Sequence, residues 1–201
     1  MATASTRAVR VDRRAQILRA AKKAFSEKGF HSASVSDIIE RAGIARGTFY
    51  LYFESKRDVF DKLLEELLAE LRACIRPIDL SPGSPQPVEQ LKANIMRVQE
   101  LVLREPELFQ LLLHQARGLD AQSAALVHAF YQRVLDLIER SLEHGMRIGL
   151  IRPCNPAIIS SCILGTVKEV AGWLIAQRQP PDREALVDEI LNFGLRGLLA
   201  R

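Results

Sequence analysis

The chain has 201 residues, 48% of them hydrophobic, and a formal net charge of +4 at pH 7. It is long enough to bury a substantial core. Residues 1–14 contain arginines with no apolar stretch behind them, which excludes a secretory signal, and no uncharged run approaches the roughly 18 residues of a membrane span. We therefore expect a soluble, cytoplasmic protein without a membrane partner.

The positive charge is concentrated near the N-terminus. Residues 1–60 hold twelve Lys and Arg residues against six acidic residues, whereas the remainder holds 16 against 18. A basic segment beside a near-neutral, larger part is typical of a phosphate-binding region attached to a body with another role. A merely soluble surface explains the same pattern, so charge alone does not decide between the two.

Apolar residues recur at helical spacing along almost the whole chain. No segment alternates with the period of two that a half-buried strand requires, so the sequence predicts an all-α fold. The first helix is expected at about residues 12–28, with one apolar and one basic face. Gly29 follows in the position of a C-terminal cap.

Two short helices are expected next. Ser34 precedes an apolar-periodic stretch and has Asp37 three residues after it, an arrangement that caps a helix at about 34–42. Gly43 then permits a left-handed turn, and a third helix is expected at about 45–52. Two short helices across a three-residue glycine turn predict a helix-turn-helix.

Longer helices make up the rest of the chain. A fourth is expected at about 56–76, followed by a loop at 77–87 that is rich in proline. The remaining helices are expected at about 88–104, 106–117, 121–148, 155–178 and 183–199. We predict an N-terminal three-helix domain with the helix-turn-helix, residues 1–55, and a larger C-terminal helical domain, residues 56–201.

The third helix supplies candidate contacts to DNA bases. A recognition helix presents its N-terminal side chains to base edges in the major groove. The candidates are Ala45, Arg46, Gly47, Thr48 and Leu51. Arg46 is the strongest because a guanidinium can bridge two acceptors of guanine, although arginine contacts phosphate just as readily. Phe49 and Phe53 are instead expected in the core of the small domain.

A second group of polar side chains is suited to phosphate. Tyr50 and Tyr52 carry hydroxyl groups for phosphate oxygens. Lys56 adds a cation at the start of the fourth helix, where the backbone N–H groups already favour an anion. Ser34 and Ser36 are further candidates at the start of the second helix, although a plain capping role also explains Ser34.

Residues 34–60, SVSDIIERAGIARGTFYLYFESKRDVF, resemble the DNA-binding signature of the tetracycline-repressor (TetR) family. The matching positions lie in register and are Ile38-Ile39, Ala42-Gly43-Ile44, Tyr50-x-Tyr52-Phe53 and Lys56. The detailed resemblance covers about residues 12–62, and it implies that both tyrosines and Lys56 contact phosphate. Ala45 is a departure, since the family often has a serine or similar cap there.

Two later helices carry small residues beside apolar ones. The candidates for a dimer interface are Ser161, Gly165, Gly172, Ile190, Gly194 and Gly197. Members of the TetR family dimerise through their last two long helices. The resemblance therefore implies a homodimer on palindromic double-stranded operator DNA. The alternative is that these glycines only ease packing inside one subunit.

The C-terminal domain is expected to bind a small-molecule effector. Polar side chains among apolar ones are the material of such a pocket, and the candidates are His114, His128, Tyr131, Cys162, Thr166 and Trp173. We predict a sequence-specific transcriptional regulator, a repressor released from its operator by a small, largely apolar effector. Activation is the open alternative for the direction of control.

Two other classes of protein stay open. One is an effector-independent architectural DNA-binding protein. The other is a helical-bundle enzyme, but none of the four histidines has a Glu three residues before it, and a nucleophile elbow is lacking. We therefore expect no catalytic residues, no metal and no cofactor. Cys74, Cys154 and Cys162 lack CxxC spacing and are expected to be reduced, buried thiols.

Overall fold

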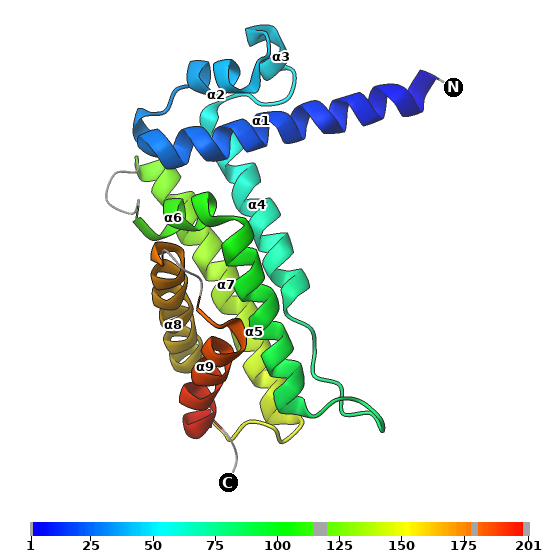
Figure 1. Ribbon diagram of the computed structural model, residues 1–201, viewed down its shortest axis with the longest axis vertical. Coiled ribbons are helices and arrows are strands. Elements are labelled where there is room, and N and C mark those ends of the chain that lie inside the picture. The colour runs from blue at the N-terminus through cyan, green and yellow to red at the C-terminus, as the bar shows by residue number, and fades with distance from the viewer. Residues whose placement is uncertain (1, 115–119, 178–180, 199–201) are drawn as a thin grey trace. The chain divides into compact units, whose positions relative to one another are not determined.

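The structure is a computed structural model that describes residues 2–114, 120–177 and 181–198, and the side chains of 13–113, 120–177 and 181–194. The described part contains helices and no strand, which confirms the predicted all-α fold (Figure 1). The helices are α1 (Ala2–Ser32), α2 (Val35–Ala42), α3 (Arg46–Tyr50), α4 (Lys56–Cys74), α5 (Pro87–Arg104), α6 (Pro106–His114), α7 (Ala121–Arg147), α8 (Pro156–Ala176) and α9 (Arg183–Leu198).

The chain folds into two compact units whose segments alternate along the sequence. The first unit consists of Met1–Leu67 and Glu107–His128, and the second of Leu68–Pro106 and Ala129–Arg201. The helices α4 and α7 each contribute residues to both units. The predicted boundary at residue 55 separates DNA binding from ligand binding and dimerisation, and it stays a prediction.

The start and end of α1 differ from the expected 12–28. The helix begins at Ala2, since residues 2–11 contain no proline or glycine that would stop it. Gly29 breaks the helical geometry at the predicted position, with φ 77° and ψ 152°, and one further turn leads to Ser32. For α6 the predicted end at 117 lies outside the described residues.

Buried aromatic rings form the centre of the first unit. Phe25, Phe30 and Phe60 are at most 1% exposed, and their ring centroids lie 4.8 to 6.2 Å apart. Such pairs contribute beyond the area that they bury. Phe49 and Phe53 are also buried, as predicted.

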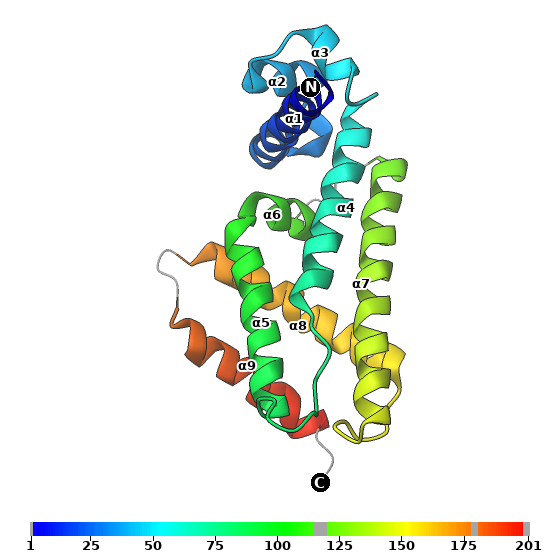
Figure 2. The same ribbon diagram turned by 90° about the vertical axis from the view of Figure 1, so that its right-hand side faces the viewer.

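In the second unit α5 contacts both α8 and α9 (Figure 2). Lys92 of α5 pairs with Asp188 of α9 at 2.8 Å. On another side of α5, the Asn94 amide donates to the Arg76 carbonyl at 2.9 Å and accepts from its N–H at 3.1 Å. This exchange satisfies the backbone just after α4 and holds it against α5.

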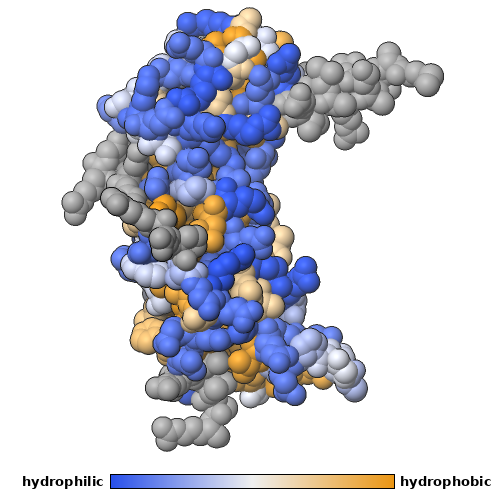
Figure 3. Space-filling view, in the orientation of Figure 1, coloured by the Kyte–Doolittle hydropathy of each residue, from blue (hydrophilic) through white to orange (hydrophobic). Residues whose placement is uncertain are grey.

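The helix α8 leaves much of its apolar surface in solvent. By length and composition it could cross a membrane, and only 17% of its apolar window is buried. A soluble helix can pass the same test, and Lys168 and Glu169 interrupt this one. Ile158 is 61% exposed and Trp173 48%, and apolar patches interrupt the hydrophilic surface over the second unit (Figure 3).

The cysteines are less buried than expected. Cys162 is exposed on α8, so the prediction of a buried thiol is wrong there, because none of the described residues covers this part of the helix. Cys74 and Cys154 are half-buried.

Candidate DNA-binding site

The helices α2 and α3 are joined as the sequence predicts. The Ser34 hydroxyl accepts from the Asp37 N–H at 3.2 Å, and the Asp37 carboxylate accepts from the Ser34 N–H at 2.7 Å, which completes a capping box. Gly43 ends α2 with φ 60° and ψ 41°, the left-handed conformation that glycine adopts at little cost. This turn sets the direction in which α3 leaves.

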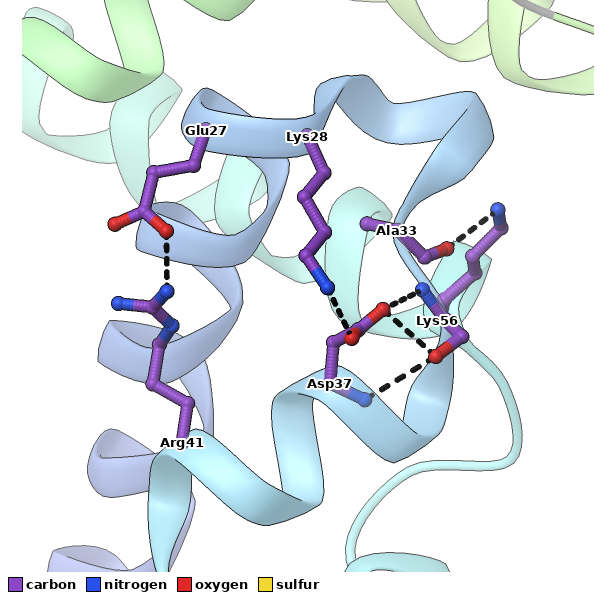
Figure 4. Close-up of polar contacts among 7 residues, drawn as sticks. Glu27, Lys28, Ala33, Asp37, Arg41 and Lys56 are labelled. Carbon is purple, nitrogen blue, oxygen red and sulfur yellow. Dashed lines mark hydrogen bonds and ion pairs between the residues drawn. The ribbon is translucent and has the colours of Figure 1, made fainter.

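Two ion pairs hold α2 against α1 (Figure 4). Lys28 Nζ lies 2.5 Å from the Asp37 carboxylate, and Arg41 pairs with Glu27. The Lys28 ammonium, with the hydrogen bonds from Ser34, holds the pKa of Asp37 well below its usual range. The position of the helix-turn-helix on α1 therefore depends on charged groups as well as on the apolar core.

The helix α3 presents the predicted base-contacting residues to solvent. Arg46 and Gly47 are exposed and Leu51 is 74% exposed, whereas Thr48 is half-buried. Phe49 points the other way and is 0% exposed. One side of this short helix is thus anchored in the core, and the other side is free to enter a groove.

Two small residues shape the start of α3. Ala45 is exposed and occupies the N-cap position without a side-chain cap, as its departure from the family pattern implies. A Cβ atom added at Gly47 would meet nothing within 4 Å. Packing within the chain therefore does not require glycine at this position.

Lys56 is engaged with the backbone at the end of α1. Its Nζ donates to the carbonyl oxygens of Phe30 and His31 at 2.9 and 2.8 Å. It also donates to the carbonyl oxygen of Ala33 at 2.9 Å, the bond drawn in Figure 4. Burial lowers the pKa of Lys56. An ammonium has three N–H donors, so a phosphate contact by this side chain would have to replace one of these bonds. These hydrogen bonds to the backbone were not predicted from the sequence, and the phosphate contact stays a prediction.

The other predicted phosphate contacts are open to solvent to different degrees. Tyr50 is 47% exposed, and the Arg46 guanidinium lies 5.8 Å from its ring centroid. Ser36 is exposed and Tyr52 half-buried, while the Ser34 hydroxyl is used in the capping box. All four contacts stay predictions.

The predicted effector residues lie in different surroundings. Lys168 Nζ lies 4.7 Å from the Tyr131 ring centroid, and burial raises the pKa of Tyr131 to about 12. Thr166 is half-buried, whereas Cys162 and Trp173 are exposed. Two candidates lie elsewhere: His128 is exposed in the first unit, and the side chain of His114 lies outside the described residues. A pocket made by these residues stays a prediction.

Two of the four glycines of the predicted dimer interface have open space where a side chain would begin. A Cβ added at Gly165 or Gly194 would meet nothing within 4 Å, whereas one at Gly145 of α7 would lie 2.6 Å from the Ile151 side chain. Ser161 is exposed, and Gly172 and Ile190 are half-buried. The surroundings of Gly197 lie outside the described residues. The described residues therefore do not require glycine at position 165 or 194, and the dimer interface stays a prediction.

Comparisons with known proteins match both parts of the chain. Residues 17–63 match the model for bacterial regulatory proteins of the tetR family, and residues 84–198 match the tetracyclin repressor-like C-terminal domain. The fatty acid metabolism regulator protein of Bacillus subtilis is 24% identical over 184 residues, 91% of this chain and 94% of that protein. The transcriptional activator FasR of Mycolicibacterium smegmatis is 24% identical over 193 residues, 94% and 84% of the two chains.

A solved structure extends the likeness to the fold. The transcriptional regulator FadR from Bacillus subtilis, in complex with stearoyl-CoA, superposes with a TM-score of 0.72 at 24% identity. The superposition covers 90% of this chain and 97% of that one.

Proposed function

Because this chain belongs to the TetR family of bacterial regulatory proteins, we propose that it is a homodimeric repressor that a long-chain acyl thioester releases from its operator. Family membership makes it a DNA-binding transcriptional regulator. The direction of control, the dimer and the effector are the parts that we propose.

The two-sided character of α3 supports sequence-specific DNA binding. Phe49 fixes the helix in the core, while Arg46, Gly47 and Leu51 face solvent. Exposed apolar and arginine side chains at the start of a recognition helix suit methyl groups and guanine edges in the major groove.

The dimer is supported by the uncovered helices of the second unit. Ile158 and Trp173 of α8 and Phe193 of α9 are 61, 48 and 76% exposed. Exposed apolar patches mark interaction surfaces. Gly165 and Gly194 leave room for another helix to approach, and a second copy of the chain offers the same face, as twofold symmetry requires.

The effector is supported by the relatives and by the course of α4. A relative from Bacillus subtilis is a fatty acid metabolism regulator protein, and the FadR structure from the same organism was solved with stearoyl-CoA. The helix α4 starts at Lys56 in the first unit and continues without a break into the second. A ligand that prefers one arrangement of the second unit therefore has a continuous element through which to act on DNA binding.

Selection of bound duplexes from a random pool tests the DNA-binding part. The wild-type chain should enrich a palindromic site with half-sites about one helical turn, or a small multiple of it, apart. Arg46→Ala should lose that enrichment. Equally tight binding to every duplex would instead identify an architectural DNA-binding protein.

A reporter gene placed behind the selected site tests the direction of control. Expression should fall when the protein is present and recover when a long-chain fatty acid is supplied. A rise in expression with the protein present would make it an activator, as FasR is described to be.

A further inference from the structure

One buried side chain of the second unit lacks the hydrogen bonds that its chemistry requires. Gln99 of α5 is 6% exposed, and within the described residues neither its Nε2 nor its Oε1 has a partner. Buried amides are nearly always paired, because an unpaired one forfeits its bonds to water. The other buried amide of α5, Asn94, is bonded through both of its side-chain polar atoms.

The position of Gln99 on α5 shows which side of the helix it occupies. It follows Lys92 by two turns, so both lie on the side that pairs with Asp188 of α9. Ile95 and Val102 stand at helical spacing on the same face. The amide is therefore set in an apolar stripe near α9, whereas Arg97 bonds to the Cys74 carbonyl on another side of α5.

The charged groups along this stretch of α5 already have partners. Lys92 pairs with Asp188, Glu100 lies 3.8 Å from Arg183, and Arg104 pairs with Glu70. An ionised ligand group brought beside Gln99 would have to compete for these charges, since a buried charge requires a partner. A neutral hydrogen-bonding group fits the site better.

We propose that the Gln99 amide is the hydrogen-bonding contact for the thioester carbonyl of the bound ligand, with Nε2 donating to the carbonyl oxygen. The proposal rests on the proposed function and assigns a residue to its ligand. Ile95 and Val102 then border the path of the apolar chain. Gln99 confers selectivity, because a ligand without a carbonyl leaves the amide unpaired.

Two CoA derivatives that differ in one oxygen atom test this assignment. Palmitoyl-CoA carries the thioester carbonyl, and S-hexadecyl-CoA is the thioether that lacks it. We expect the wild-type chain, stripped of lipid, to bind the thioester about tenfold more tightly than the thioether. A tenfold difference is about the effect of one hydrogen bond. Gln99→Leu should bind the two alike. Gln132→Leu, the same change at an exposed position of α7, should keep the wild-type preference.

A second measurement needs no ligand. Gln99→Leu removes an unpaired buried amide, so the melting temperature of the lipid-free chain should rise, and a fall would overturn the proposal. Equal binding of both derivatives by the wild-type chain would leave the proposed function standing and overturn the role of Gln99. Binding of neither would overturn the acyl thioester as effector, and the assignment of Gln99 with it.

Discussion

The helix-turn-helix and the helix α8 differ in how far their side chains find partners or burial within a single chain. Around α2 and the end of α1, Ser34 caps its helix, Asp37 has Lys28, and Lys56 binds three carbonyl groups. On α8, Ile158 and Trp173 remain in solvent. These polar groups of the first region thus have partners within the chain, and α3 keeps one surface free for DNA, whereas we propose that a second copy of the chain covers the exposed face of α8.

The largest expected effect contrasts two phenylalanines. Phe60 is 0% exposed and packs on Phe25 and Phe30, so Phe60→Ala should lower the free energy of unfolding by about 3–5 kcal/mol. Phe193 is 76% exposed, so Phe193→Ala should change it by no more than roughly 0.5 kcal/mol in the monomer. Denaturant titrations at low protein concentration measure both. Equal losses would erase the difference between the regions.

Two glycines, Gly165 and Gly145, are expected to affect assembly and folding differently. Gly165→Leu should dissociate the dimer through overpacking of about 1–3 kcal/mol per subunit while each chain stays folded. Gly145→Leu should instead destabilise each chain, because its side chain would clash with Ile151. Sedimentation velocity and thermal unfolding separate the two outcomes. An unchanged dimer for Gly165→Leu would argue against this interface.

Within the first unit, Lys56 is expected to contribute to stability and Arg46 to DNA recognition. Lys56→Met loses the bonds to three carbonyls and should lower the free energy of unfolding by about 1–3 kcal/mol. Arg46→Ala should leave unfolding unchanged and cost about 1–3 kcal/mol on the operator. Binding isotherms at several salt concentrations complete the test. The opposite result would be full stability together with a salt dependence, the slope of the log binding constant against log salt concentration, that is lower by about 1. That result would assign Lys56 to phosphate binding.

Replacing Gly47 by alanine should stabilise the fold but weaken operator binding. Gly47→Ala fills open space in α3 and should raise the free energy of unfolding by up to about 1 kcal/mol. The added methyl group should weaken operator binding if α3 approaches the DNA closely. Unchanged affinity in a gel-shift titration would remove Gly47 from the interface.

The smallest expected effect is the pH dependence that Asp37 contributes. Its pKa is lower in the folded chain than in the unfolded chain, so its contribution is complete above the unfolded value of about 3.9. That contribution is lost as the pH falls below this value. Asp37→Asn should therefore flatten the acid side of the stability curve, provided the acid unfolding is reversible. A curve parallel to that of the wild type would show that the Lys28 pair contributes nothing.

The sequence predicted the features that depend on local spacing. The helices, the Ser34 cap and the Gly43 turn follow from periodicity and from residues within a few positions of one another. The bonds of Lys56 could not be predicted in this way, because the fold brings their acceptors together from 23 to 26 positions earlier. Gln99 did leave a signal: it is a polar residue at helical spacing from Ile95 and Val102, on an apolar stripe.

We propose that ligand binding in the second unit and DNA binding by the first are coupled. Titration of palmitoyl-CoA into the dimer, with and without saturating operator duplex, tests it most directly. Coupling free energies between sites are typically about 1–3 kcal/mol, so operator should weaken palmitoyl-CoA binding by roughly 5–150-fold, and the ligand should weaken operator binding by the same factor. Equal ligand affinities in both titrations would show that the two sites are not coupled.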